Sequence, residues 1–357
     1  MEHVRGLRSL WAGSSWKYRP VEGEADQVEK ANAIVALRFV VSLRRWQRQR
    51  PGLACVNPPR RHEWRTLREE EQKSYIEAVL CLSELPSLFE PGSSRFDDMA
   101  YAHLFEGTIT HYAAAFLPFH RYFIHTFEKA LKSECGYQGG LPYWDWALDS
   151  ADLALSPVWR DVGGFSGDGN ETIGEAISGG HCVTSGPFAF ARRHWQAKYN
   201  GHGFEPLAAP HCLNRGFLAP GKDKDEFQRT ISSASLTEVM AHSQYDEFLD
   251  ALEVTAHNSI PQFVRGDFFL GTAPNDPVFY LHHAQVDRLW WLWQQQDVEN
   301  RLYAFQGPAE NKLFGSSNTS EHTQVSLRDT LSLGQFADHV QIMDLMRTDT
   351  SLLCYSY

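Results

Sequence analysis

Three histidines at regular separations are the residues of this chain whose spacing most directly predicts chemistry. His103, His111 and His120 stand eight and nine residues apart, across two predicted helices and the turn between them. His120 follows the apolar run "FLPF" near the start of a helix, so its ring can point into a helical bundle. Neutral imidazoles on facing helices are good ligands for zinc, copper or iron. The spacing therefore predicts a metal site.

A second group of histidines lies further along the chain. His257 is followed by the adjacent pair His282 and His283. Neighbours on a helix point about 100° apart, so at most one of the pair should face the same cavity as His257. Asp287 lies four residues after His283 on the same predicted helix face, where its carboxylate could orient the ring. The simpler alternative for each of these histidines is a hydrogen-bonded residue of the core or surface.

Stretches with helical spacing must position these histidines. The first predicted helix, within residues 62–86, has Thr66 as its N-cap, and Glu69 three residues later completes a capping box. Between Gly163 and Pro220 the chain is rich in Gly, Pro and His, and we expect a long irregular excursion there. The pattern predicts a mainly α fold, a helical bundle with long loops in one domain. The predicted helices fall within residues 62–86, 119–137, 237–258 and 278–296.

The overall composition argues against several classes of protein. The 357 residues carry a net charge of -11, whereas nucleic-acid-binding proteins usually present a basic face, and the basic cluster at residues 44–50 is read as a solvated helix end. No apolar stretch is long enough to span a membrane, and the first residues lack the apolar core of a signal peptide, which favours a cytoplasmic location. Sequons at Asn170 and Asn318 matter only in the secretory pathway. The six cysteines permit up to three disulfides, whose pairing the sequence leaves open.

The residues around the first histidines resemble a known copper-site signature. The stretch "HYAAAFLPFHRYFIHTFE" (residues 111–128) looks like the first copper-site signature of tyrosinases, which combines His, Phe, an aromatic-His-Arg triplet and a downstream Glu. The stretch "DPVFYLHHAQVD" (276–287) matches the second signature, and "ECGYQGGLPYWDW" (134–146) resembles a marker of the fungal branch. The resemblance covers about residues 60–295. It implies a tyrosinase-like, type 3 copper fold with an antiparallel four-helix bundle core and long irregular loops.

The same resemblance implies a domain organisation and a set of ligands. We expect a single domain over residues 1–357, with the metal-site core at about 60–300 and no separate C-terminal lid domain. In the family, two coppers are each held by three histidines. Carried over by position, the first set is complete, and the second keeps only His257 and His283 as a remnant because residue 261 is Pro261. The first set is His103, His111 and His120.

Pro261 has two expected effects. It removes an imidazole, and two histidines are too few for the second copper. It also lacks an N–H group and disfavours helical geometry at Ile260, at a cost of roughly 3 kcal/mol inside a helix. We therefore expect the helix that carries His257 to end or kink at Pro261. His282 is expected to point away from the cavity, so that it does not replace the lost ligand.

One metal on three histidines changes the expected chemistry. Three neutral histidines with an open fourth position form a recurrent catalytic zinc arrangement. Zinc does not carry electrons, but it polarises carbonyl or epoxide oxygens, so the leading hypothesis is a mononuclear zinc lyase. Cyclopenases, tyrosinase-like fungal proteins that use zinc, supply the precedent. The resemblance implies the conversion of a cyclopenin-like benzodiazepinedione epoxide, a small aromatic alkaloid-like substrate, to a viridicatin-like 4-arylquinolinone by ring contraction.

Glu253, His257 and Asn258 are the predicted catalytic residues. The resemblance implies that Glu253 orients a water molecule, and Glu253 or His257 would move the proton. Asn258 and His283 would shape the pocket. Two alternatives stay open: a phenol or catechol oxidase with two copper ions that tolerates Pro261, and a non-enzymatic protein that is metal-free or resembles an oxygen carrier.

Overall fold

The computed structural model describes residues 55–174, 176–200, 204–269, 271–310 and 325–357. Residues 51–357 form one compact unit. Some parts of the predicted single domain (1–357) lie outside the described residues. They include the basic cluster at residues 44–50 and the sequon at Asn318. Within the described part of the chain, no helix is both long and apolar enough to cross a bilayer.

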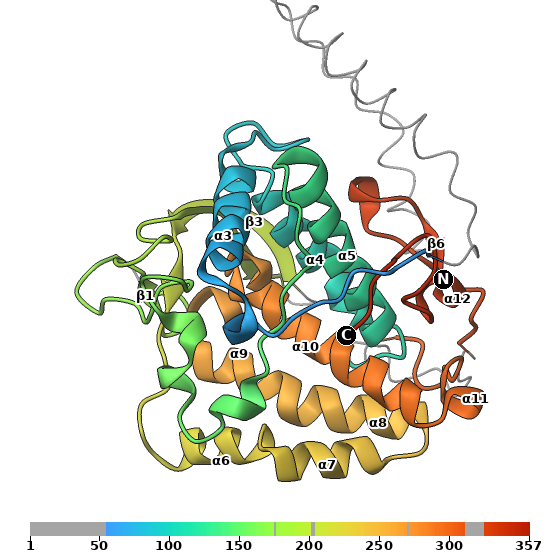
Figure 1. Cartoon of the computed structure of the whole chain (residues 1–357). Helices are drawn as coiled ribbons and strands as arrows, with labels where there is room; N and C mark the ends of the chain where they lie inside the picture. The colour runs from blue at the N-terminus through green and yellow to red at the C-terminus, as the bar shows by residue number, and fades with distance from the viewer. Residues whose placement is uncertain (1–54, 175, 201–203, 270, 311–324) are drawn as a thin grey trace, which may run out of the picture. The chain divides into compact units, whose positions relative to one another are not determined.

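Helices form the body of the fold, and the prediction of a mainly α fold is confirmed (Figure 1). The helices α5 (Phe116–Glu134) and α10 (Val278–Gln296) pack against each other. α5 is buried around most of its circumference, which is typical of a helix in the interior of a bundle. The other helices are α3 (Glu69–Glu84), α4 (Asp97–Thr110), α6 (Lys222–Thr230), α7 (Ser233–Ala241), α8 (Tyr245–Ala251), α9 (Asn258–Val264), α11 (Val298–Arg301) and α12 (Ile342–Leu345).

The predicted N-cap of α3 is wrong. The helix begins after Arg68, whose backbone N–H donates to Oε2 of Glu71 at 2.9 Å, so these two residues form the capping box. Thr66 lies instead in a short 3-10 turn, where its hydroxyl donates to the carbonyl of Glu63 at 2.7 Å. Thr66 thus belongs to the turn that precedes the helix and does not cap it.

The predicted irregular excursion contains a β-hairpin that the sequence pattern did not reveal. β2 (Arg192–Tyr199) pairs antiparallel with β3 (Phe204–Cys212), and both strands pack against α4. The sequence of β3, FEPLAAPHC, lacks the alternation of apolar and polar residues that predicts a strand, and none of its residues is fully buried. Two shorter pairs join β1 (His181–Cys182) to β4 (Asn214–Arg215) and β5 (Thr330–Leu331) to β6 (Val340–Gln341).

The six cysteines form three disulfides, a pairing that the sequence left open. The bonds join Cys55 to Cys354, Cys81 to Cys135 and Cys182 to Cys212. A disulfide typically stabilises a fold by about 2–4 kcal/mol. Disulfides are characteristic of oxidising compartments, which weighs against the cytoplasmic location that the first residues favour. The location stays a prediction.

The segment that carries His257 differs from the expected one. Between α8 and α9 the helix passes through a π-helical turn, η5 (Leu252–His257), in which the N–H of Asn258 donates to the carbonyl of Glu253. The predicted end or kink at Pro261 is wrong as to the end, because the helix continues past Pro261 to Val264. Pro261 lies in the first turn of α9, directly after the π turn, and its lack of an N–H removes one hydrogen bond of the helix.

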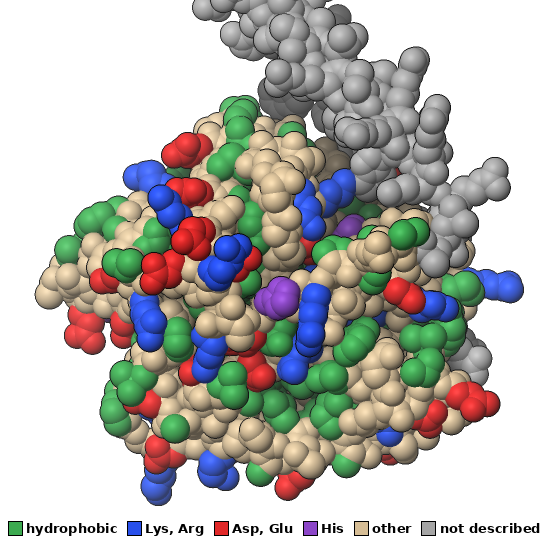
Figure 2. Space-filling model, in the orientation of Figure 1, with side chains coloured by type: hydrophobic (Ala, Val, Ile, Leu, Met, Phe, Trp, Pro, Cys, Tyr) green, Lys and Arg blue, Asp and Glu red, His purple; other side chains and the backbone are tan. Residues whose placement is uncertain are grey.

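Charged side chains of both signs are interspersed on the face of the molecule shown in Figure 2. This face has no continuous basic surface of the kind that binds nucleic acid. The net charge of -11 acts in the same direction. The expectation that nucleic acid is not a partner stays a prediction.

Candidate metal centre

The first histidine group lies where α4 meets α5. His103 is on α4, His111 is the C-cap of the same helix, and His120 is near the start of α5. One ring nitrogen of each residue lies within 4.8 Å of one ring nitrogen of the other two. The Nε2 atoms of His103 and His120 are 3.3 Å apart. The fold therefore brings together the three residues that their spacing singled out.

Backbone carbonyl groups orient all three rings. In each residue Nδ1 lies within hydrogen-bond distance of a carbonyl oxygen: His103 to Gly271 at 2.7 Å, His111 to Gly107 at 2.7 Å and His120 to Phe116 at 2.9 Å. A carbonyl oxygen only accepts, so each Nδ1 carries the ring proton and each Nε2 keeps its lone pair. Two lone pairs 3.3 Å apart repel each other unless a cation or a proton lies between them. The arrangement fits a cation held by three Nε2 atoms.

Burial keeps these imidazoles neutral. It lowers the pKa of His103 to about 3, and the neighbouring His111 adds to the effect. Burial also lowers the pKa of His111 and takes that of His120 well below its usual value. Neutral imidazole is the form that coordinates zinc, copper and iron. The site therefore favours a metal ion over a proton.

The second histidine group contains one residue more than the sequence predicts. His257 ends η5, and His282 and His283 are adjacent on α10. One ring nitrogen of each lies within 4.8 Å of one ring nitrogen of the other two. The ring centroid of His257 is 5.0 Å from those of both His282 and His283. His282 is not among the residues that line the cavity, as predicted, but one of its ring nitrogens lies close to those of His257 and His283, which the sequence did not predict.

The second group lacks the uniform hydrogen bonding of the first. Nδ1 of His257 contacts Oδ1 of Asn258 at 2.9 Å. Nδ1 of His283 has no hydrogen-bond partner among the described residues, and its ring stacks on that of His120 with centroids 3.9 Å apart. Nδ1 of His282 accepts a hydrogen bond from Nε1–H of Trp146 at 3.2 Å. The two groups are therefore unequal as sets of metal ligands.

Asp287 does not contact His283, although their spacing predicts it. Its Oδ1 accepts from Nε of Arg121 at 2.5 Å, and its Oδ2 accepts from the hydroxyls of Tyr355 at 2.5 Å and Tyr357 at 2.6 Å. Nη1 of Arg61 lies 3.2 Å from the same Oδ2. Residues from both ends of the described chain thus surround this carboxylate. Asp287 stabilises the bundle behind the site and leaves Nδ1 of His283 without a carboxylate partner.

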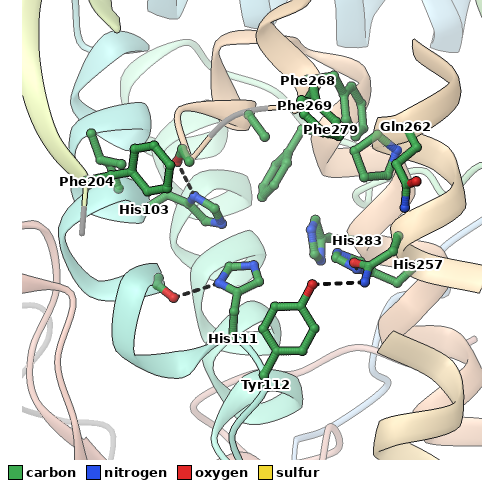
Figure 3. Close-up of a pocket in the computed structure, with 16 residues that line it drawn as sticks. His103, His111, Tyr112, Phe204, His257, Gln262, Phe268, Phe269, Phe279 and His283 are labelled. Atoms are coloured by element: carbon green, nitrogen blue, oxygen red, sulfur yellow. Dashed lines mark hydrogen bonds between the residues drawn. The ribbon is translucent and has the colours of Figure 1, made fainter. Parts of the chain in front are cut away.

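Glu253 and Asn258 both act on Tyr112, a residue that the sequence analysis missed. Oε1 of Glu253 accepts from the backbone N–H of Tyr112 at 2.8 Å. Nδ2 of Asn258 donates to the hydroxyl of Tyr112 at 3.1 Å, as Figure 3 shows. Tyr112 has a φ of 54°, a left-handed conformation that costs an ordinary residue about 1–3 kcal/mol. Glu253 is buried and is not among the residues that line the cavity. Its contacts indicate that it positions the residue after His111.

A cavity with a volume of about 380 Å³ opens onto both histidine groups. Figure 3 shows His103, His111, His257 and His283 around it, with the Tyr112 ring beside His111. Among the described residues, no Asp, Glu, Lys or Arg lines this cavity. A wall of rings with few polar groups suits a neutral aromatic ligand. The aromatic residues of the wall, apart from histidine, are Tyr112, Phe204, Phe268, Phe269 and Phe279.

Comparisons with known proteins agree with this arrangement. Residues 93–296 match the family described as the common central domain of tyrosinase. The tyrosinase-like protein phomQ1' of Diaporthe leptostromiformis is 44% identical over 310 residues, which cover 86% of this chain and 82% of that protein. Tyrosinase ustQ of Aspergillus flavus is 38% identical over 311 residues, which cover 85% of this chain and 80% of that protein.

A solved structure shows a similar fold. A polyphenol oxidase from Thermothelomyces thermophila matches with a TM-score of 0.71 and 26% sequence identity, over 95% of this chain and 98% of that protein. Both histidine groups fall within the region that matches the family. The comparisons and the two groups together imply that this chain binds metal.

Proposed function

Because this chain belongs to the tyrosinase family, we propose that it is a member that holds one zinc ion and catalyses a non-redox rearrangement. Family membership indicates a metal-using enzyme, and its relatives are fungal tyrosinase-like proteins. The proposed role is a lyase of fungal secondary metabolism that acts on a small aromatic alkaloid-like substrate. The proposal includes neither a nucleic-acid partner nor a membrane partner.

The inequality of the two histidine groups carries this proposal. In the first group, three backbone carbonyls hold three rings so that every Nε2 keeps a free lone pair. In the second group, Pro261 stands at a position where the family has a ligand, and Nδ1 of His283 has no partner among the described residues. The first group therefore supports a tightly bound ion, and the second supports at most a weak one.

Zinc held by His103, His111 and His120 would polarise a carbonyl or epoxide oxygen of the substrate. The protein's own side chains would bind and orient the substrate and transfer the proton. The aromatic wall binds the substrate rings and excludes water, while the Tyr112 hydroxyl and the Asn258 amide orient its oxygen atoms. His257 accepts or returns a proton at Nε2, because its Nδ1 is engaged with Asn258. Glu253 holds the backbone of Tyr112 in place.

We propose a cyclopenin-like benzodiazepinedione epoxide as the substrate. Such a molecule is neutral and carries two aromatic rings, which matches a wall of rings without charged side chains among the described residues. Its ring contraction to a 4-arylquinolinone expels the remaining atoms as an isocyanate. That reaction consumes neither oxidant nor reductant, so a metal without redox chemistry is sufficient.

Metal analysis and an anaerobic assay test this proposal. Protein purified without added metal is expected to contain one zinc per chain, measured by inductively coupled plasma mass spectrometry. It is expected to convert cyclopenin to a quinolinone equally well with and without oxygen. His120→Ala should lose the zinc, whereas the matched control His125→Ala, five residues along the same helix, should keep it. Two coppers per chain and oxidation of catechol would overturn the proposal.

A copper-dependent phenol or catechol oxidase is the second candidate. It is favoured by the position of His282, since the second group then contains three histidines with nitrogens within 4.8 Å of one another. The tyrosinase and polyphenol oxidase among the similar proteins agree with it. Adding copper to the metal-free protein under oxygen distinguishes the two candidates. A visible absorption band of an oxygen-bound copper pair would support the oxidase, and its absence supports the zinc lyase.

A further inference from the structure

Trp146 lies next to the second histidine group and is completely buried. It is the last residue of the fungal-type stretch "ECGYQGGLPYWDW" and begins the 3-10 turn η2 (Trp146–Asp149). Its indole Nε1–H donates to Nδ1 of His282 at 3.2 Å. An indole N–H donates and does not accept hydrogen bonds, so Nδ1 of His282 must be the acceptor in this contact.

The contact with Trp146 determines which nitrogen of His282 carries the proton. A ring whose Nδ1 accepts a hydrogen bond is not doubly protonated, so it holds one N–H. Because Nδ1 accepts from the indole, that proton is on Nε2. Nε2 is buried and has no hydrogen-bond partner among the described residues. Neither nitrogen therefore offers a free lone pair: Nδ1 uses its own on Trp146, and Nε2 is protonated.

We infer that Trp146 sets the number of metal ions, because its hydrogen bond to Nδ1 of His282 prevents that residue from becoming the third ligand of a second site. The inference rests on the proposed one-zinc function. Only His257 and His283 remain as ligands in the second group, since Pro261 supplies none. Trp146 is a positioning residue here, acting through His282.

The reverse tautomer is unfavourable while Trp146 is present. If His282 carried its proton on Nδ1, two N–H groups would face each other at 3.2 Å and the indole would lose its acceptor. Without the indole N–H, the ring can place its proton on either nitrogen and remain neutral throughout. One nitrogen of His282 already lies within 4.8 Å of nitrogens of His257 and His283, the same limit that the first group meets. Removal of one donor would thus complete a second set of three ligands.

The test is a zinc titration of metal-free protein, followed by dialysis and measurement of bound zinc by mass spectrometry. Wild type is expected to retain one zinc and Trp146→Phe two. The matched control is Trp144→Phe, which removes another fully buried indole whose N–H donates to Oδ2 of Asp149 at 2.8 Å, and it should retain one zinc. The double variant Trp146→Phe with His282→Ala should return to one.

Each outcome has one meaning. One zinc in both wild type and Trp146→Phe overturns this inference and leaves the proposed function standing. Two metals in wild type overturn the proposed function instead. If Trp146→Phe does not fold, nitrogen NMR of the histidine-labelled wild type decides, with the His282 signals assigned by their loss in His282→Gln. A proton on Nε2 supports the inference, and a proton on Nδ1 overturns it.

Discussion

Gly107 lies between two ligand histidines on α4 and provides a direct way to separate metal binding from stability. It is one turn after His103 and one turn before His111. Its carbonyl accepts from Nδ1 of His111 at 2.7 Å. A methyl group at this position would lie 3.2 Å from Cε1 of His111 and 3.4 Å from Cε1 of His103. Relaxed carbon contacts are about 3.5–4.0 Å, so the His111 ring must move by a few tenths of an ångström, while the His103 ring is only just touched.

Gly107→Ala is therefore expected to lower metal affinity while leaving stability nearly unchanged. Alanine in a helix interior is favoured over glycine by about 1 kcal/mol, which offsets the crowding, so the metal-free variant should unfold within about 1 kcal/mol of wild type. Displacement of ligand rings lowers metal affinity, and changes that disturb ligand orientation typically cost about 10–100-fold. We expect a loss of affinity for zinc of at least about 10-fold.

Urea unfolding of the metal-free protein and competition for zinc with a chelator measure the two quantities. Ile109→Ala is the control, since this exposed residue of α4 is not among those that line the cavity. The control should keep its zinc affinity. An unchanged affinity in Gly107→Ala would refute the reasoning, because the first group would then not be the zinc site.

Three further variants or conditions test other contacts. Glu253→Ala removes the acceptor for the backbone N–H of Tyr112, so it should lower the free energy of unfolding by about 1–3 kcal/mol and weaken zinc binding. Glu253→Gln keeps an acceptor oxygen and should retain zinc and turnover. An inactive Glu253→Gln variant would show that Glu253 transfers the proton. In the metal-free protein, burial lowers the pKa of His103 and of His257 from 6.5 to about 3, so the unfolded chain binds more protons between these values and stability falls as the pH drops below 6.5. Each of these two histidines should lower the free energy of unfolding by about 2 kcal/mol at pH 5. Urea unfolding from pH 7.5 to 5 checks the sign, and a free energy that does not change with pH would contradict it. Asp287→Asn leaves the buried Arg121 without its carboxylate partner and removes one of two from Arg61, which should cost about 3–5 kcal/mol, while the folded fraction still binds zinc. Zinc loss without destabilisation would restore Asp287 as a partner of His283.

The first histidine group was predictable because its spacing follows from local structure. His103, His111 and His120 lie on two consecutive helices, and the aromatic-His-Arg triplet belongs to a recognisable signature. The buried helices α5 and α10 were predictable for a similar reason, since their apolar residues are dense and regular. Local periodicity is sufficient where both partners come from neighbouring elements.

The second group was less predictable because it depends on contacts between distant segments. The π turn η5 changes the register of the helix just before His257, and nothing in "LEVTAH" marks it. Such turns are rare and often occur at functional sites. Trp146, which determines the tautomer of His282, lies 136 positions away in the sequence. The direction of a buried ring therefore had to come from the fold.

Asp287 and Tyr112 show the same limit. The spacing of Asp287 and His283 on one helix predicted a contact, but arginines and C-terminal tyrosines compete for the carboxylate and bind it. Tyr112 has a positive φ that its residue type does not predict, and a carboxylate from a distant helix stabilises it. Both contacts join residues more than 60 positions apart.

Anomalous diffraction from crystals of the purified protein tests the central claim most directly. Data collected above and below the zinc and copper absorption edges identify each bound ion and its position. The account predicts one zinc peak bound by Nε2 of His103, His111 and His120, and no ion bound by His257 and His283. A pair of copper peaks, one at each histidine group, would contradict it.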